Sequence, residues 1–534
     1  MGFTHRRGWL ILIGGPALLS LLPMAVLLPG ILESSSTWLH LRRTVLADYI
    51  LGSLILLAGA GGGAFLLGTT LAWVMSRYSI PFRSFFEIAL LLPHAMPVYI
   101  SAFGYRGLVS YGGLLHPLFR EFSGPGAAIF VMTFGFYTYV YLACRAMLGT
   151  FGGQFIDSAR AVGIGEWQLF ARVALPLMRP AAFAGTVIVG IEVLNEFGAL
   201  TYLGVESLTT GIFRAWFAFG DLTAAVKLSL IMLAAVALLI TAERLLRGRA
   251  SFAASGSGPA PVSRRKPSRS VTLILMIFLS IPILLGFILP GLQLLLWAGT
   301  GNSAAHADRL VEITVNTLLL SGFAGLAGVG AALLIGFLPL LFRRGIGRVL
   351  AEAPGLGYVV PGAIIAIGIM RITVPLDSWL NDLHFHFFNS TLGLILTGNL
   401  AILTAAYCIR YFAVAYRPID SAYTSLGSLH IDTAAGLGRS PLYVFLRVYL
   451  PQLRQAAFFG GILFLLDVIK ELPLTMILRP FNFSTLATAT YALAADERLN
   501  EAAPYGLVLV AIGGGITVLF MMISSLQNYR RRKQ

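Results

Sequence analysis

Two pairs of acidic residues stand inside long apolar stretches, where ionisable groups are scarce. Glu192 and Glu196 are four residues apart, and Asp467 and Glu471 repeat this spacing later in the chain. Residues four apart share one face of a helix. A carboxylate near the middle of a membrane costs on the order of 2.5–3.5 kcal/mol on insertion scales, so it usually faces a cavity or a partner. We therefore expect these four residues, together with Lys470, to line a translocation pathway or to form a gate.

The chemistry of this set is that of cation passage. Carboxylates are ligands that hard cations prefer, so Glu196 and Glu471 are also candidates for direct metal ligation. A structural alternative stays open, in which Lys470 or a cytoplasmic arginine simply neutralises the acids. No catalytic residues are predicted, because the eight histidines are scattered and no nucleophile–base constellation lies within the apolar stretches.

The composition places the chain in a membrane. Of its 534 residues 57% are hydrophobic and only 11% are charged, about half the charge of a soluble protein. The net charge of +15 does not indicate nucleic-acid binding, because the basic residues cluster in short segments between apolar runs. That distribution is typical of a membrane orientation signal.

The apolar runs predict an all-α polytopic protein with about twelve transmembrane helices, each long enough to cross a hydrocarbon layer of roughly 30 Å. The predicted spans are 9–31, 49–76, 86–104, 127–144, 182–204, 223–243, 271–297, 312–341, 352–370, 391–409, 457–478 and 505–526. Residues 1–246 form a first module and 271–534 a second. Between them, residues 247–270 are rich in Gly, Ser and Pro and are expected to form a flexible, solvated linker.

The positions of the basic residues predict the orientation. With the N-terminus in the cytoplasm, most arginines and lysines fall on the cytoplasmic side, Arg145 and Arg410 among them. The positive-inside rule then places both termini and the linker in the cytoplasm.

The two modules repeat each other. Residues 157–221 align without a gap on 432–496, which pairs Glu196 with Glu471 and Thr210 with Thr485. Six helices in each module give both the same orientation, so the repeat is parallel. Such a repeat implies a pseudo-twofold axis along the membrane normal and a pathway between the halves.

The third predicted helix of each module is interrupted. Pro93 and Pro97 lie in one, and Pro354 and Pro361, each followed or preceded by glycine, lie in the other. Matching broken helices often line a translocation pathway. A kinked packing helix is the alternative.

Two predicted cytoplasmic loops, 155–180 and 430–455, carry one pattern of Asp, Ala, Gly, Leu and Pro. Its members are Asp157, Ala159, Gly163, Leu175, Pro176 and Asp432, Ala434, Gly438, Leu450, Pro451. The Asp is expected to cap a short helix, the Gly to end it, and the Pro to break a second short helix before the next span. An apolar ridge ready to enter a partner's groove is the predicted product.

No phosphate-cradling loop accompanies these segments. Such a loop needs Gly-Lys followed by Ser or Thr, and none of Lys227, Lys266, Lys470 and Lys533 follows a glycine. Any ATP-driven motor is therefore expected on a separate polypeptide.

The twin loops resemble the Glu-Ala-Ala signature of ABC importer permeases, with Asp in place of Glu and Ser or Thr in place of the first Ala. The resemblance implies a type I permease fold in a bacterial inner membrane, working by alternating access. Two copies of a cytoplasmic ABC ATPase would dock on the loops and bind ATP and Mg, and a periplasmic substrate-binding protein would deliver the cargo. No cofactor is implied in this chain, and its partners are these proteins and the membrane lipid.

Wider stretches resemble the fused permeases of ferric-iron importers, notably Lys470-Glu-Leu-Pro473 and Arg479-Pro-Phe-Asn482. This likeness implies ferric iron as the cargo. Related permeases carry thiamine, phosphonates or polyamines, so these substrates remain alternatives. A secondary transporter is the alternative from another class, and it would not need paired docking loops.

Overall fold

The computed structural model describes residues 10–117, 121–247, 262–300, 307–342, 345–427, 429–436 and 439–531. These residues are almost entirely helical, and no strand occurs among them beyond one isolated bridge between Tyr78 and Arg265. Helices satisfy their own backbone hydrogen bonds, which lipid cannot do. The predicted all-α membrane fold is confirmed.

The first half runs from residue 10 to residue 247. Its elements are η1 (Leu10–Gly14), α2 (Gly15–Leu19), α3 (Leu22–Ala25), η2 (Leu28–Ile31), α4 (Ser36–Thr44), α5 (Leu46–Arg77), α6 (Arg83–Ala89), α7 (Leu92–Ala95), α8 (Val98–Val109), α9 (Gly124–Ala161), α10 (Glu166–Leu169), η3 (Phe170–Ala174), α11 (Leu175–Asn195), α12 (Gly198–Tyr202), α13 (Leu208–Phe213), η4 (Arg214–Ala218) and α14 (Leu222–Arg247).

The second half follows from residue 269. Its elements are α15 (Arg269–Ile283), η5 (Leu284–Ile288), α16 (Leu289–Thr300), α17 (Ala307–Gly336), α18 (Leu338–Leu341), α19 (Ile346–Glu352), η7 (Ala353–Gly355), α20 (Leu356–Val359), α21 (Gly362–Phe388), α22 (Leu400–Leu426), α23 (Leu429–Gly436), α24 (Pro441–Val444), η8 (Phe445–Tyr449), α25 (Leu450–Ile469), α26 (Pro473–Leu478), α27 (Leu486–Ala495) and α28 (Leu499–Arg531).

Ten helices in the described part of the chain are long and apolar enough to cross a membrane. An eleventh is the bent pair Arg83–Ala95 and Val98–Val109, whose two parts meet at 90° around Pro97. The helix α22 has 27 residues but is not among the ten, because Arg410, Arg417 and Asp420 make it less apolar. It packs between α17 and α25 inside the second half.

The expected third and fourth spans of the second half were misplaced. The chain turns at Val360 and Pro361, and the long helix α21 then continues to Phe388, well beyond the predicted end at residue 370. The next helix begins at Leu400, nine residues after the predicted start. Apolar composition does not mark these ends, because the apolar run begins before Pro361 and continues after it.

The first helices of each half pack against the other half. Tyr105 of α8 donates a hydrogen bond to the carbonyl of Leu285 in η5, at 2.6 Å. Gly104 of α8 packs on Pro290 of α16, and Gly368 of α21 packs just as closely on Pro23 of α3. A β-carbon at Gly368 would lie 2.0 Å from the Pro23 carbonyl, so only glycine permits this approach. The two exchanges are related by the pseudo-twofold symmetry of the repeat.

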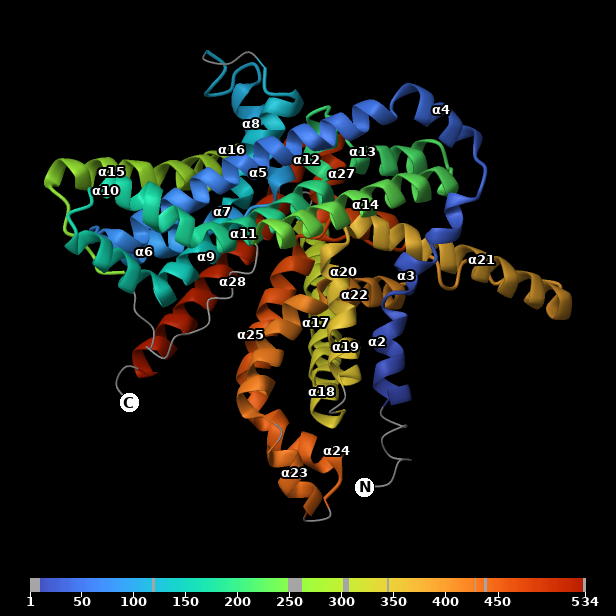
Figure 1. The fold of residues 1–534 in the computed structure, drawn as a ribbon. Coiled ribbons are helices and arrows are strands. Elements are labelled where there is room, and N and C mark those ends of the chain that lie inside the picture. Colours follow the sequence, from blue (N-terminus) through green and yellow to red (C-terminus); the bar gives the residue numbers. More distant parts are fainter. Residues whose placement is uncertain are drawn as a thin grey trace.

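The long helices of the two halves cross in the view of Figure 1. The long helices of the first half lie roughly horizontal in this view, whereas α17 and α25 of the second half lie roughly vertical. We call the end that carries α10 in the first half, and α23 and α24 in the second half, the motif end. The opposite end, with α4 and α13 in the first half and α27 in the second half, is called the far end. In Figure 1 the two motif ends lie at separate corners of the molecule.

The repeat contains an insertion that the gapless alignment misses. Glu196 accepts a hydrogen bond from the Ala199 N–H, and Glu471 accepts one from the Leu474 N–H, so these two residues are equivalent as predicted. Further on, Ser207 and Thr210 form a capping box at α13, and its counterpart at α27 is Thr485 with Thr488. Thr210 therefore corresponds to Thr488, not to Thr485. The second half has gained three residues between these points, in the loop that follows α26.

Candidate functional site

The predicted acidic residues come together where the two halves meet. Glu192, Glu196, Asp467, Lys470 and Glu471 all line one small cavity of about 60 Å³. The cavity takes its walls from both halves, with His94 and Tyr139 from the first and Tyr411 from the second. The sequence thus identified the acidic residues that the fold brings together, although it named only part of their surroundings.

The second acid of each pair does not share a helix with the first, as was expected. The helix α11 ends at Asn195 and α25 ends at Ile469, so Glu196 and Glu471 lie just beyond these ends. Each then holds the start of the next short helix, because its carboxylate accepts a backbone N–H at 2.9 Å (Ala199) or 3.0 Å (Leu474). Carboxylates are well suited to the unpaired N–H groups of a helix start. The chain break is what lets both acids reach the cavity.

In the second half Glu471 is paired with a buried arginine. Arg410 is 1% exposed and Glu471 is 4% exposed, and their Nε and Oε2 atoms are 3.6 Å apart. The Tyr411 hydroxyl also donates to Glu471, and Arg410 Nη1 donates to the Val360 carbonyl at 2.5 Å. The placement of Arg410 in a cytoplasmic segment was therefore wrong. The predicted span ended at residue 409, whereas α22 begins at Leu400, which puts Arg410 in the interior of a helix.

Lys470 neutralises Asp467, in agreement with the structural alternative for this residue. Its Nζ lies 3.0 Å from Asp467 Oδ1 and 3.3 Å from Nε2 of His94, which belongs to the first half. This contact is one of the polar links across the interface. Another joins the Asn195 side-chain carbonyl to the Gly362 N–H at 2.8 Å.

The first half supplies acids but no lysine or arginine to the cavity. The residues equivalent to Lys470 and Arg410 are Asn195 and Gly135, by the register that pairs Glu196 with Glu471. Within the described residues Glu192 and Glu196 make no ion pair. The four carboxyl groups therefore have two strongly basic neighbours, Lys470, which lines the cavity, and Arg410, which does not line it but is paired with Glu471. This difference in basic side chains between the halves could be recognised only when the structure showed that Arg410 lies in a helix interior.

The cavity does not form a dedicated metal cage. Among the residues that the structure describes, no group of three or more His, Cys, Asp or Glu side chains is close enough to hold a metal ion. Direct ligation by Glu196 and Glu471 therefore gains no support from the geometry. Four acids spread around a small cavity are better suited to passing a cation than to retaining one.

The first predicted loop differs from its expected form in two respects. Asp157 and Ala159 lie inside α9, near its end, and the Asp157 carboxylate accepts a hydrogen bond from Ser263 instead of capping a helix. The helix α10 continues through η3 into α11 with Leu175 and Pro176 in the first turn of α11, so Pro176 does not break it.

Gly163 makes the turn that was predicted. Its φ of +82° is in the left-handed region, which favours glycine. Around it the loop presents apolar side chains to solvent, with Val162 81% exposed and Trp167 75% exposed. An exposed apolar ridge of this kind is a candidate protein-docking surface.

The second loop has the same order of elements, except that its first helical part is divided into α22 and α23. Asp432 and Ala434 lie in α23, and α24 continues through η8 into α25 with Leu450 and Pro451 at its start. Gly438 lies outside the described residues. Leu429 and Leu442 are exposed here, so both halves present apolar side chains at the motif end.

The end of the linker is docked, not solvated. Arg77 is fully buried and binds Glu166 of α10 at 2.8 Å and the Ser263 carbonyl at 2.8 Å. Arg265 binds the same Glu166 at 3.0 Å and pairs its backbone with Arg77 and Ser79. Residues 262–266 are thus anchored to the first half, although Arg264, Arg265 and Lys266 stay exposed, and residues 248–261 lie outside the described part. No sequence pattern links Arg77 to residues so far along the chain.

These features define a class of protein. Residues 55–249 match the family described as binding-protein-dependent transport system inner membrane component. The match lies in the first half, and the crossed halves, the shared cavity and the paired motif segments support the same class, an ABC transporter permease that crosses the inner membrane several times and has two modules in one polypeptide.

The relatives agree with this layout. The Fe(3+)-transport system permease protein FbpB 2 of Haemophilus influenzae is 26% identical over 479 residues, which cover 89% of each chain. The probable ABC transporter permease protein y4fN of Sinorhizobium fredii is 22% identical over 84% of this chain and 82% of its own. The sulfate transport system permease protein CysT of Escherichia coli is 26% identical over 46% of this chain and 93% of its own length. A single-module relative thus matches about half of this chain.

Proposed function

We propose that the chain is the permease of an ATP-driven importer that moves ferric iron across the inner membrane. The observation that carries the proposal is the cavity between the halves, which four carboxyl groups line together with Lys470 and His94, while Arg410 pairs with Glu471. Acidic side chains in a low-dielectric site attract a cation and repel an anion. Hard ferric ion is matched by carboxylate oxygen.

The relatives name two kinds of cargo, iron and sulfate, and the cavity favours the first. A sulfate ion in this cavity would meet Glu192 and Glu196, which form no ion pair with any described residue. One relative that matches 89% of the chain is named for Fe(3+) transport. Phosphonates are disfavoured by the same charge argument, whereas the cationic thiamine and polyamines remain alternatives for the experiment to exclude.

The proposed mechanism uses the two motif ends as levers. Two copies of a cytoplasmic ABC ATPase dock on the exposed ridges around Val162 and Trp167 and around Leu429 and Leu442. A periplasmic binding protein docks at the far end. Closure of the ATPase dimer brings the separated motif ends together, and because each half holds the first helices of the other, the halves pivot about the cavity. Both chain termini and the linker then lie in the cytoplasm.

The test is radiolabelled uptake in cells that lack this subunit and carry either the wild-type chain or a variant. Glu192→Gln combined with Glu196→Gln removes the unpaired acids and is expected to reduce ⁵⁵Fe uptake strongly while leaving the amount of protein in the membrane unchanged. Glu352→Gln, in an exposed pair with Arg348, is the matched control and should transport normally.

The other cargoes are measured in the same strains. If deletion leaves iron uptake intact but abolishes uptake of sulfate, thiamine or a polyamine, the iron assignment is wrong. If iron uptake persists when ATP is depleted and stops when the ion gradient collapses, the chain works as a secondary transporter instead.

A further inference from the structure

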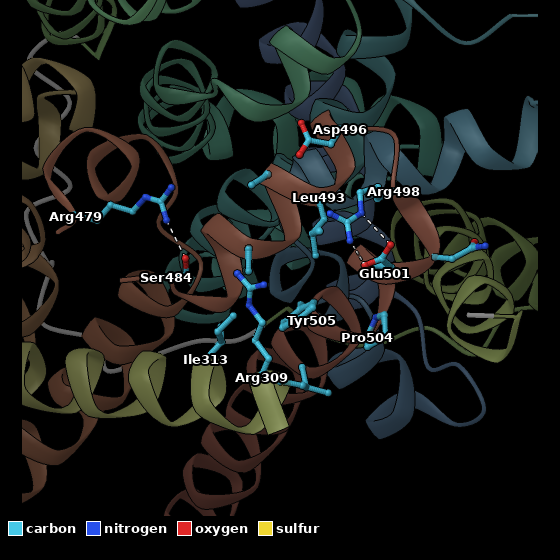
Figure 2. A pocket seen from close by; sticks show the side chains of 14 residues that line it. Arg309, Ile313, Arg479, Ser484, Leu493, Asp496, Arg498, Glu501, Pro504 and Tyr505 are labelled. Carbon is cyan, nitrogen blue, oxygen red and sulfur yellow. Dashed lines mark hydrogen bonds and ion pairs between the residues drawn. The ribbon is translucent and has the colours of Figure 1, made fainter. Parts of the chain in front are cut away.

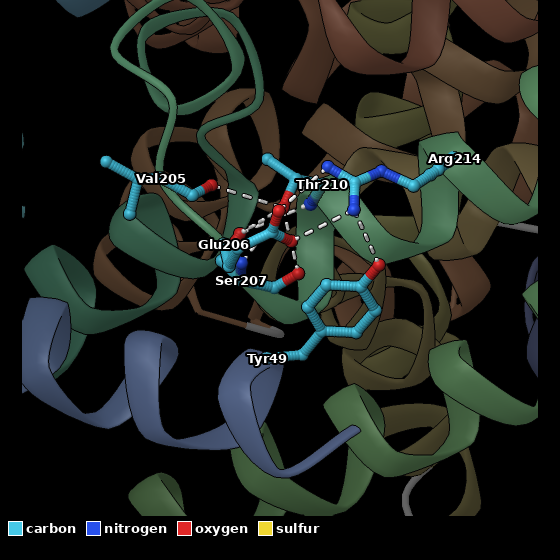
Figure 3. Close-up of polar contacts among 6 residues, drawn as sticks. All are labelled: Tyr49, Val205, Glu206, Ser207, Thr210 and Arg214. Carbon is cyan, nitrogen blue, oxygen red and sulfur yellow. Dashed lines mark hydrogen bonds and ion pairs between the residues drawn. The ribbon is translucent and has the colours of Figure 1, made fainter. Parts of the chain in front are cut away.

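The two halves differ at one corner of the far end. In the first half Arg214 closes this corner by binding Glu206 through two bonds, at 2.9 and 3.2 Å, and by donating to the Tyr49 hydroxyl at 3.1 Å (Figure 3). The Tyr49 ring packs directly against Gly211 of α13. The corner between α5 and α13 is thereby filled.

Matching hydrogen bonds give the equivalent residues of the second half. Ser53 of α5 accepts the N–H of Leu208, and Thr317 of α17 accepts the N–H of Leu486. Counting from these pairs, four residues before Ser53 is Tyr49 and four before Thr317 is Ile313. In the same way Glu206 corresponds to Ser484 and Arg214 corresponds to Ala492. All three members of the closing cluster are thus replaced by smaller or apolar residues.

A cavity of about 300 Å³ lies where the cluster is missing (Figure 2). Ile313, Ser484 and Ala492 all line it, and Leu310, Leu493 and Pro504 extend its apolar part. The cavity therefore lies at the corner where the two halves differ in sequence.

Three arginines surround this cavity. Arg498 is paired with Glu501, with Nε and Oε1 2.9 Å apart, and Arg479 donates to Ser484 Oγ at 2.9 Å and to the Phe483 carbonyl at 3.0 Å. Arg309, in the first turn of α17, makes no hydrogen bond or ion pair with any described residue. Figure 2 shows its side chain extending beside Tyr505 into the space between α17 and α27.

The position of the cavity matches the boundary of a lipid layer. It lies at the far-end starts of two spans, α17 and α28, so Arg309 stands where an apolar segment begins. Two and six residues further along α17, Val311 and Val315 are exposed, as expected for a surface in contact with acyl chains. The cavity is amphipathic, because guanidinium groups, with the carboxylates of Asp496 and Glu501 near them, and apolar side chains all line it.

We propose that this cavity binds the phosphate group of a membrane phospholipid, with Arg309 as its principal partner and with Leu310 and Ile313 against the first methylene groups of the lipid. A planar guanidinium binds phosphate oxygens through paired, charge-assisted hydrogen bonds. Basic pockets between transmembrane helices bind lipid head groups by this chemistry. The site belongs to the second half alone and does not depend on the identity of the transported cargo.

The experiment counts phospholipids retained by the purified full-length permease in native mass spectra, after reconstitution with phosphatidylglycerol. Two variants remove the site by different routes. Arg309→Gln removes the free cation, and the triple variant Ile313→Tyr/Ser484→Glu/Ala492→Arg rebuilds the closed corner of the first half inside the second. Arg214→Gln, in the first half, is the matched control.

Wild type and the control are expected to retain one phospholipid that both site variants lose. If an excess of inorganic phosphate displaces that lipid, or binds in an Arg309-dependent way without it, free phosphate also reaches the site and the phosphate chemistry stands. Equal retention of lipid and phosphate by all four proteins would overturn the proposal. It would also be overturned if Arg309→Gln weakened only the association with the binding protein, because the pocket would then be a protein-docking surface.

Discussion

At the residue scale, the second half's side of the cavity depends on one buried arginine. Arg410 reaches Glu471 and the Val360 carbonyl at the point where α21 begins, and the Tyr411 hydroxyl completes the set of donors to Glu471. A carboxylate buried to this degree needs such partners, because removing an ion from water costs several kcal/mol. The acids of the first half form no ion pair among the described residues, so under the proposed function they are the ones available to the cargo.

A double-mutant cycle tests this division of roles. Arg410→Met leaves Glu471 buried without its cation and is expected to lower the free energy of unfolding by about 3–5 kcal/mol. Adding Glu471→Gln should restore much of the loss, because the uncompensated charge is gone. Thermal unfolding of the purified protein measures both.

The control for the cycle lies on the same helix. Arg417 is exposed, seven residues beyond Arg410, and Arg417→Met should change stability by less than about 0.5 kcal/mol, as surface changes usually do. If the double variant were no more stable than Arg410→Met alone, Arg410 would act by packing and not by neutralising Glu471.

At the scale of elements, the motif segment is continuous with the spanning helix. The helix α10 passes through η3 into α11 without a break, so a force applied at Trp167 is carried directly to Glu192 and Glu196 at the other end. The docked linker residues 262–266 stiffen the same segment through Glu166. A rigid connection from the docking ridge to the cavity is what a lever requires.

Two neighbouring glycines of this segment provide a matched test. Gly163 has a φ of +82°, whereas Gly165 has a φ of −68°, and neither would place a β-carbon within 4 Å of another atom. Gly163→Ala is therefore expected to cost about 1–2 kcal/mol through backbone strain alone and to reorient the ridge. Gly165→Ala should be tolerated.

Co-purification of the ATPase with each variant is the measurement. Gly163→Ala should reduce the amount recovered, and Gly165→Ala should not. Equal recovery with both variants, at wild-type levels, would remove this segment from the docking surface.

At the scale of the whole molecule, the exchange of first helices ties the halves together at the far end. Arg371 of α21 binds Glu33, with Nη1 and Oε2 3.0 Å apart, and also binds the Val26 carbonyl at 3.1 Å. Hydrogen bonding to Arg371 lowers the pKa of Glu33 below its ordinary value of 4.5. The ionised form of Glu33 is thus favoured by the assembled protein.

The pH dependence of this tie follows from that direction. A lowered carboxyl pKa contributes stability in full above the ordinary value, and the contribution is lost as the pH falls through the lowered pKa. The difference in unfolding temperature between wild type and Glu33→Gln should be constant above about pH 5 and shrink below pH 4.5. Glu121→Gln, which removes an exposed acid bonded to nearby Ser123, should show no such trend. A difference that grew on acidification would contradict the ion pair.

The amino-acid sequence by itself determined the membrane class, most of the spans, the parallel repeat, the paired motif segments and the acidic residues of the cavity. Each of these is a local property, set by apolar run length or by short spacings that occur twice, so it can be read without knowing what lies beside it. Gly163 is the clearest case, because a left-handed turn is a demand on one residue.

Only the tertiary structure decided which charges meet. Arg410 looked like an orientation signal until the true start of α22 placed it in a helix interior beside Glu471, 61 residues away in sequence. Arg77 and Arg265, the exchange of first helices and the open corner at Ile313, Ser484 and Ala492 depend on contacts between distant segments and on a three-residue insertion. Such contacts arise from packing one half against the other, and no local pattern in either half encodes them.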